Sequence, residues 1–255
     1  MSWAGLSGSG VTLSDSPYET NRFGRTFARI VVGHDADESV AGELTSLIDG
    51  CEAEIIVVRY PAGLARLGAV LAKSGRGVLP ADTLVYWEVP AADAEAAGAD
   101  GLTTSVDDTP SAETSAVLRR VVEASFAGYG NHYTANPDLD PELALAGYLE
   151  WAARAYATNP RNVVLLRHRD EVVGAATLTS DGDDLEIELA GLVPAAQGQG
   201  WYADLLTAVR AEAVKRGLGR VIISTQAANV RVQRAWARAG FKPFAAVNTC
   251  HLIRR

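Results

Sequence analysis

A short glycine-containing loop between a predicted strand and a predicted helix is the first feature of the sequence suited to binding a charged ligand. It lies within GLVPAAQGQGWYADLL, after a strand that ends at Val193, and consists of Gln197, Gly198, Gln199 and Gly200. Glycines let backbone N–H groups approach an anion closely, and a helix start offers unpaired N–H groups and a positive dipole end. The pattern indicates a pyrophosphate cradle; an ordinary strand-to-helix turn is the alternative.

The same loop resembles the acetyl-CoA signature of the GNAT acyltransferases, Q/R-x-x-G-x-G/A. It reads QGQGWY, so Tyr202 stands where the signature has Gly or Ala. Further along, NVRVQRAWARAGF resembles the second signature of that family, with Asn229 near a helix start, an aromatic residue and a closing Gly-Phe. The chain is therefore similar to GNAT N-acetyltransferases. The resemblance implies acetyl-CoA as acyl donor and an α/β (α+β) GNAT fold, a mixed and mostly antiparallel sheet flanked by helices.

The resemblance also implies where the donor binds. Pantetheine is expected between two splayed strands, beside the backbone of Leu192 and Val193, where an N–H group polarises the thioester carbonyl. Asn229 lies near the pantetheine arm. The expected donor-binding residues are Leu192, Val193, Gln197, Gly198, Gln199, Gly200, Trp201, Tyr202, Asn229 and Trp236. Arg231, Arg234 and Arg238 form a helical stripe that either meets the 3′-phosphate or is a solvated face.

Position 236 departs from the family pattern. Many GNAT enzymes place there a Tyr that protonates the leaving thiolate, whereas this chain has Trp236. An indole N–H donates a hydrogen bond but does not release its proton in the relevant pH range. Protonation of the thiolate is therefore expected from Tyr202, from water or from the ammonium, or else it matters little.

Direct N-acylation requires a neutral amine and hence a base. Glu188 precedes Leu192 by four residues, where several GNAT enzymes carry a base, and Glu186 is expected on the same face of the strand. His132, in the loop YGNHYTANPD, has a suitable intrinsic pKa and is the second candidate. A solvated strand face or a structural histidine are the alternatives. His251, on the last predicted strand, is expected to face the acceptor.

The acceptor-binding residues are expected in the same loop: Tyr129, Asn131 and Tyr133, together with His251. More loosely, the whole chain resembles the TDP-fucosamine acetyltransferase group, through SPYETNRFGRTFARI and FAGYGNHY…GYLEW. That resemblance implies acetylation of the amino group of a nucleotide-linked aminodeoxy sugar. A GNAT enzyme for another small-molecule amine, such as a metabolite or an antibiotic precursor, and a non-catalytic acyl-CoA-binding module remain alternatives.

The elements that position these residues follow from hydrophobic periodicity. DLEIELAGLV alternates as a half-buried strand, RVIIST is a further strand, and helices are expected at about 200–216 and 229–239. Because the resemblance implies a splay, the DLEIELAGLV and RVIIST strands are expected to be parallel neighbours that separate at their C-terminal ends.

Composition divides the chain into two parts. Residues 91–112 are rich in Ala, Asp, Gly and Thr and are expected to link an N-terminal α/β domain, 1–90, to the GNAT domain, 113–255. Residues 56–75 lie over 221–240 without a gap, strand on strand and helix on helix. The first part is therefore either a degenerate half-copy of the GNAT domain or an unrelated strand–helix–strand unit.

The bulk properties exclude several classes of protein. With 48% hydrophobic and 21% charged residues the chain is globular, and no apolar run is long enough to span a bilayer. A net charge of −8 argues against nucleic-acid binding, and the two cysteines, Cys51 and Cys250, have no metal-ligand spacing and suggest a reducing cytoplasm. The expected partner is a small-molecule amine, with no membrane and no metal. The oligomeric state stays open, a homodimer being one alternative.

Overall fold

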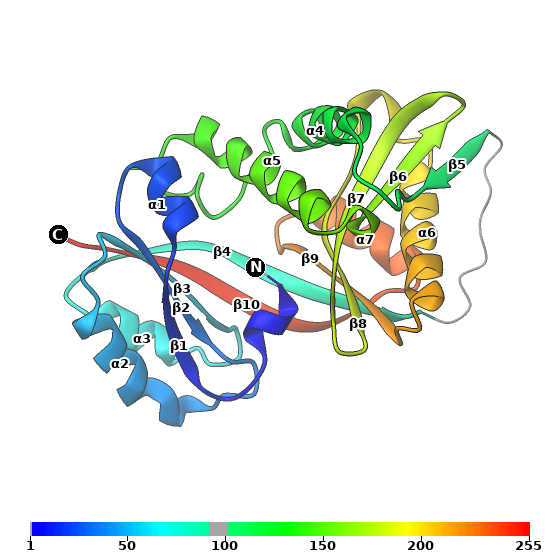
Figure 1. The fold of residues 1–255 in the computed structure, drawn as a ribbon. Helices are drawn as coiled ribbons and strands as arrows, with labels where there is room; N and C mark the ends of the chain where they lie inside the picture. Colours follow the sequence, from blue (N-terminus) through cyan, green and yellow to red (C-terminus); the bar gives the residue numbers. More distant parts are fainter. Residues whose placement is uncertain (1, 92–100) are drawn as a thin grey trace.

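The structure, a computed structural model, describes residues 2–91 and 101–255 and is built on one continuous ten-stranded sheet (Figure 1). The strand order is β1-β2-β3-β10-β4-β9-β8-β7-β6-β5. The strands are β1 (Val11–Asp15), β2 (Phe27–Val32), β3 (Ile55–Pro61), β4 (Gly77–Pro90), β5 (Leu102–Ser105), β6 (Val163–His168), β7 (Glu171–Asp181), β8 (Asp184–Leu192), β9 (Arg220–Gln226) and β10 (Lys242–Ile253). Neighbouring strands are antiparallel except for β2 with β3 and β8 with β9, as the GNAT fold predicted.

Helices cover both faces of the sheet. They are α1 (Pro17–Phe23), α2 (Ala41–Gly50), α3 (Leu67–Ala72), α4 (Ala112–Phe126), α5 (Pro141–Thr158), α6 (Trp201–Lys215) and α7 (Val230–Arg238). Alternation along β6 shows how the faces divide, because side chains of successive residues point to opposite sides. Val163 and Leu165 pack with α4 and α5, whereas Val164 and Leu166 pack with α6. In the N-terminal part, α2 and α3 cover one face of β2, β3 and β10.

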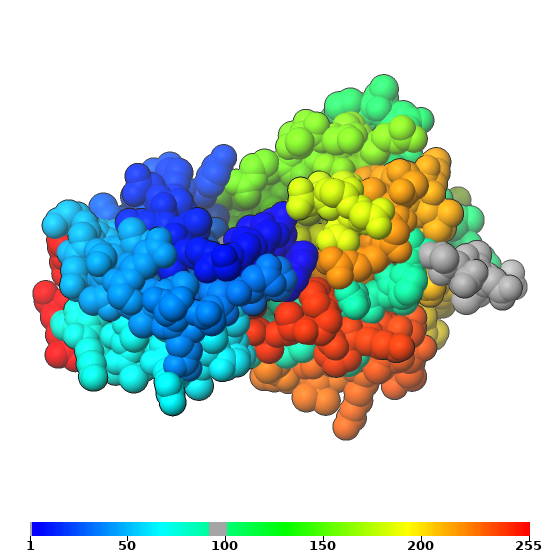
Figure 2. All heavy atoms as spheres, turned by 90° about the horizontal axis from the view of Figure 1, so that it is seen from below, coloured from blue at the N-terminus to red at the C-terminus, as the bar shows by residue number. Residues whose placement is uncertain are grey.

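Two long, neighbouring strands, β4 and β10, connect the N-terminal and C-terminal parts of the chain. β10, the last strand of the chain, lies between β3 and β4, and β4 in turn pairs with β9. In Figure 2, red residues from the C-terminus lie against cyan residues of the N-terminal part. The 91–112 boundary seen in composition therefore does not separate two sheets, because each part supplies a strand to the other.

The internal similarity seen in the sequence has a structural counterpart. β3, α3 and β4 follow one another as β9, α7 and β10 do, and β3 and β9 each pair in parallel with the strand before them, β2 and β8. Of the segment expected as a linker, residues 92–100 lie outside the described residues, and Leu102–Ser105 form the edge strand β5, paired with β6. The residues are β-prone, but the run is too short to stand out from the polar residues around it.

The expected separation of β8 and β9 is confirmed. They pair in parallel only from Asp184 with Arg220 to Ile187 with Ile223, although β8 continues to Leu192 and β9 to Gln226. The pairing of β8 with β7 shifts register between Thr177 and Leu178, so that Glu188 is the extra residue of a bulge. A bulge bends the strand and re-aims its side chains. The bend therefore accompanies the opening between the two strands.

Candidate functional site

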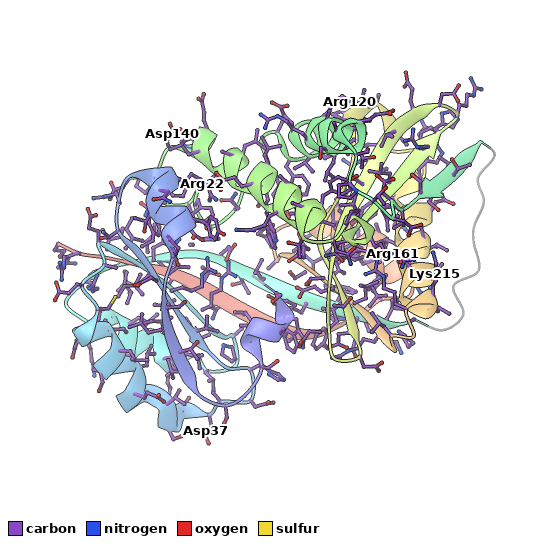
Figure 3. The ribbon with its side chains drawn as sticks, viewed as in Figure 1. Arg22, Asp37, Arg120, Asp140, Arg161 and Lys215 are labelled. Carbon is purple, nitrogen blue, oxygen red and sulfur yellow. The ribbon has the colours of Figure 1, made fainter. Side chains whose placement is uncertain are left out.

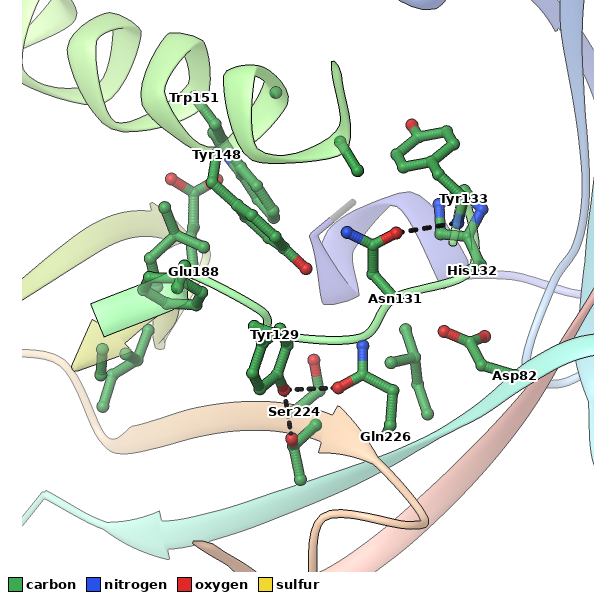
Figure 4. Close-up of a pocket in the computed structure, with 18 of the residues that line it drawn as sticks. Asp82, Tyr129, Asn131, His132, Tyr133, Tyr148, Trp151, Glu188, Ser224 and Gln226 are labelled. Atoms are coloured by element: carbon green, nitrogen blue, oxygen red, sulfur yellow. Dashed lines mark hydrogen bonds between the residues drawn. The ribbon is translucent and has the colours of Figure 1, made fainter. Parts of the chain in front are cut away.

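A cavity of about 480 Å³ begins at the splay between β8 and β9 and extends under α5 to the N-terminal part of the sheet. Its C-terminal wall is formed by β8, β9, α6 and α7, and its roof by α5 and the 127–140 loop (Figure 4). The N-terminal part supplies the remaining wall, from α1, β2, β3 and β4. Both parts of the chain therefore build one cavity.

The glycine loop has the backbone that an anion cradle requires. Gly198 and Gly200 have φ values of 82° and 86°, in the left-handed region that favours glycine, and the loop is exposed. α6 begins directly afterwards at Trp201, so its first N–H groups have no partner within the helix. Gln197 folds back and donates from Nε2 to the Leu192 carbonyl (3.1 Å). Trp201, expected among the donor-binding residues, packs on His168, with ring centroids 4.4 Å apart. The loop fits a pyrophosphate group.

At the end of β8, the two residues expected beside the thioester, Leu192 and Val193, differ in the direction of their backbone N–H groups. The Val193 N–H donates to the Val173 carbonyl of β7 (2.9 Å), so it is not available to a ligand. In an antiparallel pair alternate residues point their N–H groups away from the partner strand, and Leu192 and Ala190 are those residues here. The oxyanion donor expected at Leu192 or Val193 is therefore consistent with Leu192 and with Ala190, but not with Val193.

Asn229 and Tyr129 join the cavity wall through mutual contacts. Asn229 caps α7, accepting from the Val232 N–H (3.4 Å), and its Nδ2 donates to the Thr225 hydroxyl (3.0 Å). The Tyr129 hydroxyl bonds to the Thr225 hydroxyl (2.8 Å) and to Gln226 of β9 (Figure 4). These bonds fasten the 127–140 loop to the strand that borders the splay.

Tyr202 and Trp236, the two departures from the family signatures, contact each other. The Trp236 Nε1 donates to the Tyr202 hydroxyl (3.1 Å), and both side chains line the cavity. Burial raises the pKa of Tyr202 to about 12, so its hydroxyl is protonated at neutral pH. Because that oxygen accepts from Trp236, the hydroxyl proton is free to point elsewhere. The pair can therefore present one O–H donor to a ligand near the splay.

Glu188 projects from the bulge into the cavity beside Trp151 of α5 (Figure 4). Burial raises its pKa, an effect partly offset by a hydrogen bond with Trp151 and by the charge of Arg154. Glu186, expected on the same face, does not line the cavity. Its carboxylate accepts the backbone N–H of Trp3 (2.6 Å), and burial raises its pKa to about 7. Of the two glutamates, Glu188 faces the ligand space.

His132 lines the cavity and forms a buried pair with His251, which does not line the cavity itself, so the expectation that His251 faces the acceptor is not supported. His132 Nδ1 lies 2.9 Å from His251 Nε2, and Asn136 Nδ2 lies 3.2 Å from His251 Nδ1. The amide orientation of Asn136 is fixed because its Oδ1 accepts the Asp138 N–H (3.0 Å). Burial lowers the pKa of both histidines, that of His251 to about 4, so both are neutral at neutral pH.

This chain of bonds determines the tautomers. Asn136 Nδ2 can only donate, so His251 accepts at Nδ1 and carries its proton on Nε2. His251 then donates to His132 Nδ1, which leaves the His132 proton on Nε2. A neutral His132 in this network offers an N–H donor from Nε2 and has no free ring nitrogen to accept a proton.

The other two loop residues have structural partners. The Asn131 side chain accepts the Tyr133 N–H (2.8 Å) and shapes the turn, while the Tyr133 hydroxyl donates to Glu19 of α1 (2.8 Å). Both residues line the cavity. The loop expected to form the acceptor site thus bridges β9, β10 and α1.

Sequence reasoning missed the charged wall supplied by the N-terminal part: Glu19, Arg22, Arg29, Arg59 and Asp82. Arg29 pairs with Glu19 (2.5 Å), and Arg22 of α1, which is labelled in Figure 3, pairs with Glu150 of α5 (2.6 Å). One signal was available, because Arg29 and Arg59 each interrupt a buried apolar strand, in FARIVV and IIVVRYP. A charge inside such a run is costly without a partner.

Comparison with known proteins assigns the C-terminal part. Residues 126–241 match the Acetyltransferase (GNAT) family. Uncharacterized N-acetyltransferases of Mycobacterium bovis and Mycobacterium tuberculosis are 37% identical over 107 residues, which is 41% of this chain and 65% of theirs. The chain thus spans 65% of the length of these relatives. The matched segment is a GNAT N-acetyltransferase segment, and this family uses acetyl-CoA as acyl donor.

Solved structures extend the likeness of fold to nearly the whole chain. A GCN5-related N-acetyltransferase from Sphaerobacter thermophilus has a TM-score of 0.65 at 15% identity, over 96% of this chain and 78% of that one. A tandem GNAT protein from the clavulanic acid biosynthesis pathway has a TM-score of 0.53 at 15% identity, over 97% and 85%. The chain therefore has the GNAT fold, with tandem GNAT-like neighbours. Among residues 2–91 and 101–255, no helix combines the length and apolarity needed to cross a membrane.

Proposed function

We propose that this protein transfers an acetyl group from acetyl-CoA to a primary amine, directly and with Glu188 as general base. The observation that carries the proposal is a cavity that begins at the splay between β8 and β9 and is lined by the half-buried Glu188, at the bulge of β8, and by Tyr202, in the first turn of α6. The exposed glycine loop directly precedes this turn of α6.

Each step has a residue suited to it. Bound acetyl-CoA supplies an acetyl thioester, whose carbonyl can accept a hydrogen bond from a β8 N–H group facing the splay, at Leu192 or Ala190. Glu188 takes a proton from the acceptor ammonium, directly or through water, and the freed nitrogen attacks the carbonyl carbon. As the N–C bond forms, the C–S bond breaks and the sulfur leaves with the bonding electrons, and the second proton of the nitrogen passes to the thiolate or to water. Tyr202 can donate a hydrogen bond from its O–H to that sulfur.

The choice of Glu188 over His132 is supported by hydrogen bonding. His132 has its Nδ1 occupied by His251 and its proton on Nε2, which suits it to hold an acceptor oxygen rather than to remove a proton. Glu188 has two oxygens that accept, and its raised pKa brings its proton affinity nearer to that of a base working at neutral pH.

For the acceptor we propose the amino group of a nucleotide-linked aminodeoxy sugar. The cavity is long enough to reach from the splay to the N-terminal part of the sheet, and Tyr129, Tyr148 and Trp151 provide flat surfaces for a sugar or a base. A fungal glucosamine N-acetyltransferase region has a similar fold, with a TM-score of 0.58 at 12% identity over 89% of this chain and 30% of that one. Another small-molecule amine is the second candidate.

The test is CoA release from acetyl-CoA with a panel of amines, combined with calorimetric binding of CoA. Release that depends on an amine supports the enzyme, and the preferred amine identifies the acceptor class. Tight CoA binding without release with any amine would instead indicate a binding module. Absence of CoA binding would refute the proposal altogether.

A further inference from the structure

Arg59 stands apart from the other cationic residues of the cavity. It lies in the middle of β3 and is only 5% exposed. On β10 its neighbour is Thr249, and the neighbour of Thr249 on β4 is Asp82, so the three side chains share one face of the sheet. This face is the one that closes the cavity at its N-terminal end.

The guanidinium of Arg59 has unused hydrogen-bonding capacity. Its Nε and Nη1 are buried without a hydrogen-bond partner, and Arg59 forms no ion pair with a carboxylate in the described residues. Arg29 and Arg22, by contrast, each have a carboxylate partner. An isolated buried cation is costly, and buried polar groups are nearly always paired. A ligand that occupies the cavity is a natural source of the missing partner.

Neighbouring charges leave the end of the cavity favourable to an anion. The charged lining residues are Arg22, Arg29, Arg59 and Arg154 against Glu19, Asp82 and Glu188. Glu19 is already paired with Arg29, and Glu188 faces the splay end. Asp82 is the remaining carboxyl on this face, and its oxygens form no ion pair with Arg59. Among the described residues, no carboxylate is therefore paired with Arg59.

We propose that Arg59 binds an anionic group of the acceptor, a phosphate or a carboxylate, while the amine to be acetylated lies at Glu188. The inference rests on the proposed function and narrows it, because the acceptor then carries an acidic group at a distance from its amine. It also assigns the N-terminal part of the chain a task, since β3 holds the residue that selects the acceptor. Arg presents a planar fork of donors that suits phosphate and carboxylate groups.

Pairs of acceptors that differ by one anionic group test this selection. Glucosamine 6-phosphate is compared with glucosamine, and lysine with 1,5-diaminopentane, in addition to a nucleoside-diphosphate-linked amino sugar. The acidic member is expected to have the higher kcat/KM. Arg59→Met should reduce that preference roughly 10- to 100-fold, the worth of a charge-assisted bidentate contact, while leaving the neutral member unchanged. Arg66→Met, at an exposed arginine of the same part of the chain, is the matched control and should change neither.

A binding measurement separates this inference from the proposed function. With CoA at saturation the glycine loop is occupied, so calorimetric titration with pyrophosphate or with glutarate reads a second anion site and shows which acid group it takes. Binding should be present in the unchanged protein and lost in Arg59→Met. Acetyl transfer that is equally fast with acidic and neutral amines, with no second anion bound, would overturn the role of Arg59 and leave the acetyltransferase intact.

Folding of the variant serves as an independent readout. Since Arg59 is buried and pairs with no carboxylate of the described residues, Arg59→Met should unfold at the same temperature as the unchanged protein or a higher one. A structural role of the guanidinium would be shown by three results together. They are a markedly lower unfolding temperature of Arg59→Met, an acceptor preference that Arg59→Lys retains in full, and no second anion bound to the protein. Arg59→Lys is expected to give an intermediate preference, because it keeps the charge but loses the fork.

Discussion

Replacing Glu188 by Gln removes the proposed base while keeping the size and one acceptor oxygen of the side chain. Glu188 lies in the cavity, and its raised pKa places its titration closer to neutral pH than that of an ordinary glutamate. General base catalysis is worth roughly 10²- to 10⁴-fold, so kcat should fall by about that factor. The affinity for acetyl-CoA should not change, because Glu188 lies on β8 and is not part of the glycine loop.

The assay follows CoA release at saturating acetyl-CoA across pH. A base must be deprotonated to act, so the rate of the unchanged enzyme should rise with pH through the pKa of Glu188. Since that pKa is raised, the rising limb should lie above the usual range for a glutamate. In Glu188→Gln this limb should vanish. Glu186→Gln is the matched control: Glu186 lies two residues away and also has a raised pKa, yet it faces Trp3 instead of the cavity. It should retain the limb.

Three results distinguish Glu188 from His132 as the base. A loss of less than about tenfold in Glu188→Gln, below the usual worth of a base, would refute the role of Glu188. His132→Ala should mainly raise the KM for the acceptor, as loss of a binding contact does. The reverse pattern, with kcat lost in His132→Ala and KM raised in Glu188→Gln, would mean that the tautomers derived from Asn136 are wrong and that His132 is the base.

Three further predictions concern the donor site, the leaving group and stability. Gly200→Asp should abolish CoA binding in calorimetry while Gly200→Asn, which tolerates the same positive φ, binds measurably; equal losses would mean that charge is not the cause. Tyr202→Phe should lower kcat roughly 10- to 100-fold at unchanged acetyl-CoA affinity, the cost of a lost hydrogen bond to a charged sulfur, and an unchanged kcat would exclude this donor. The pKa of Glu186 is raised from 4.5 to about 7 on folding, so the folded state holds the proton of Glu186 more tightly than the unfolded state does. The free energy of unfolding should therefore fall by up to about 3 kcal/mol as the pH rises from 4.5 to 7. Denaturant titrations of Glu186→Gln should lack this slope, and a slope equal to that of the unchanged protein would assign it to other groups.

Much of the fold and of the donor site could be predicted because the signals are local. The glycine loop and the helix that follows it are read from adjacent residues, and so is the alternation of the DLEIELAGLV strand. The observed α6 (Trp201–Lys215) and β9 (Arg220–Gln226) lie within a residue or two of expectation. Local backbone preferences and side-chain periodicity determine such elements. The similarity of residues 56–75 to 221–240 was visible for the same reason.

The acceptor side depended on tertiary structure. Because β10 pairs with both β3 and β4, His251 lies beside His132, and Arg59 and Asp82 lie at one end of the cavity. Glu188 lines the same cavity at its other end. These residues are far apart in the chain, and no local pattern says which strand will pair with which. The bulge at Glu188 is also a property of the pairing with β7, because it exists only relative to the partner strand. The sequence by itself determined the strand and helix that flank the glycine loop and predicted an anion cradle there, through short-range sterics and hydrogen bonds. Only the tertiary structure decided which charged groups meet, because burial and pairing of charges arise when distant segments pack together.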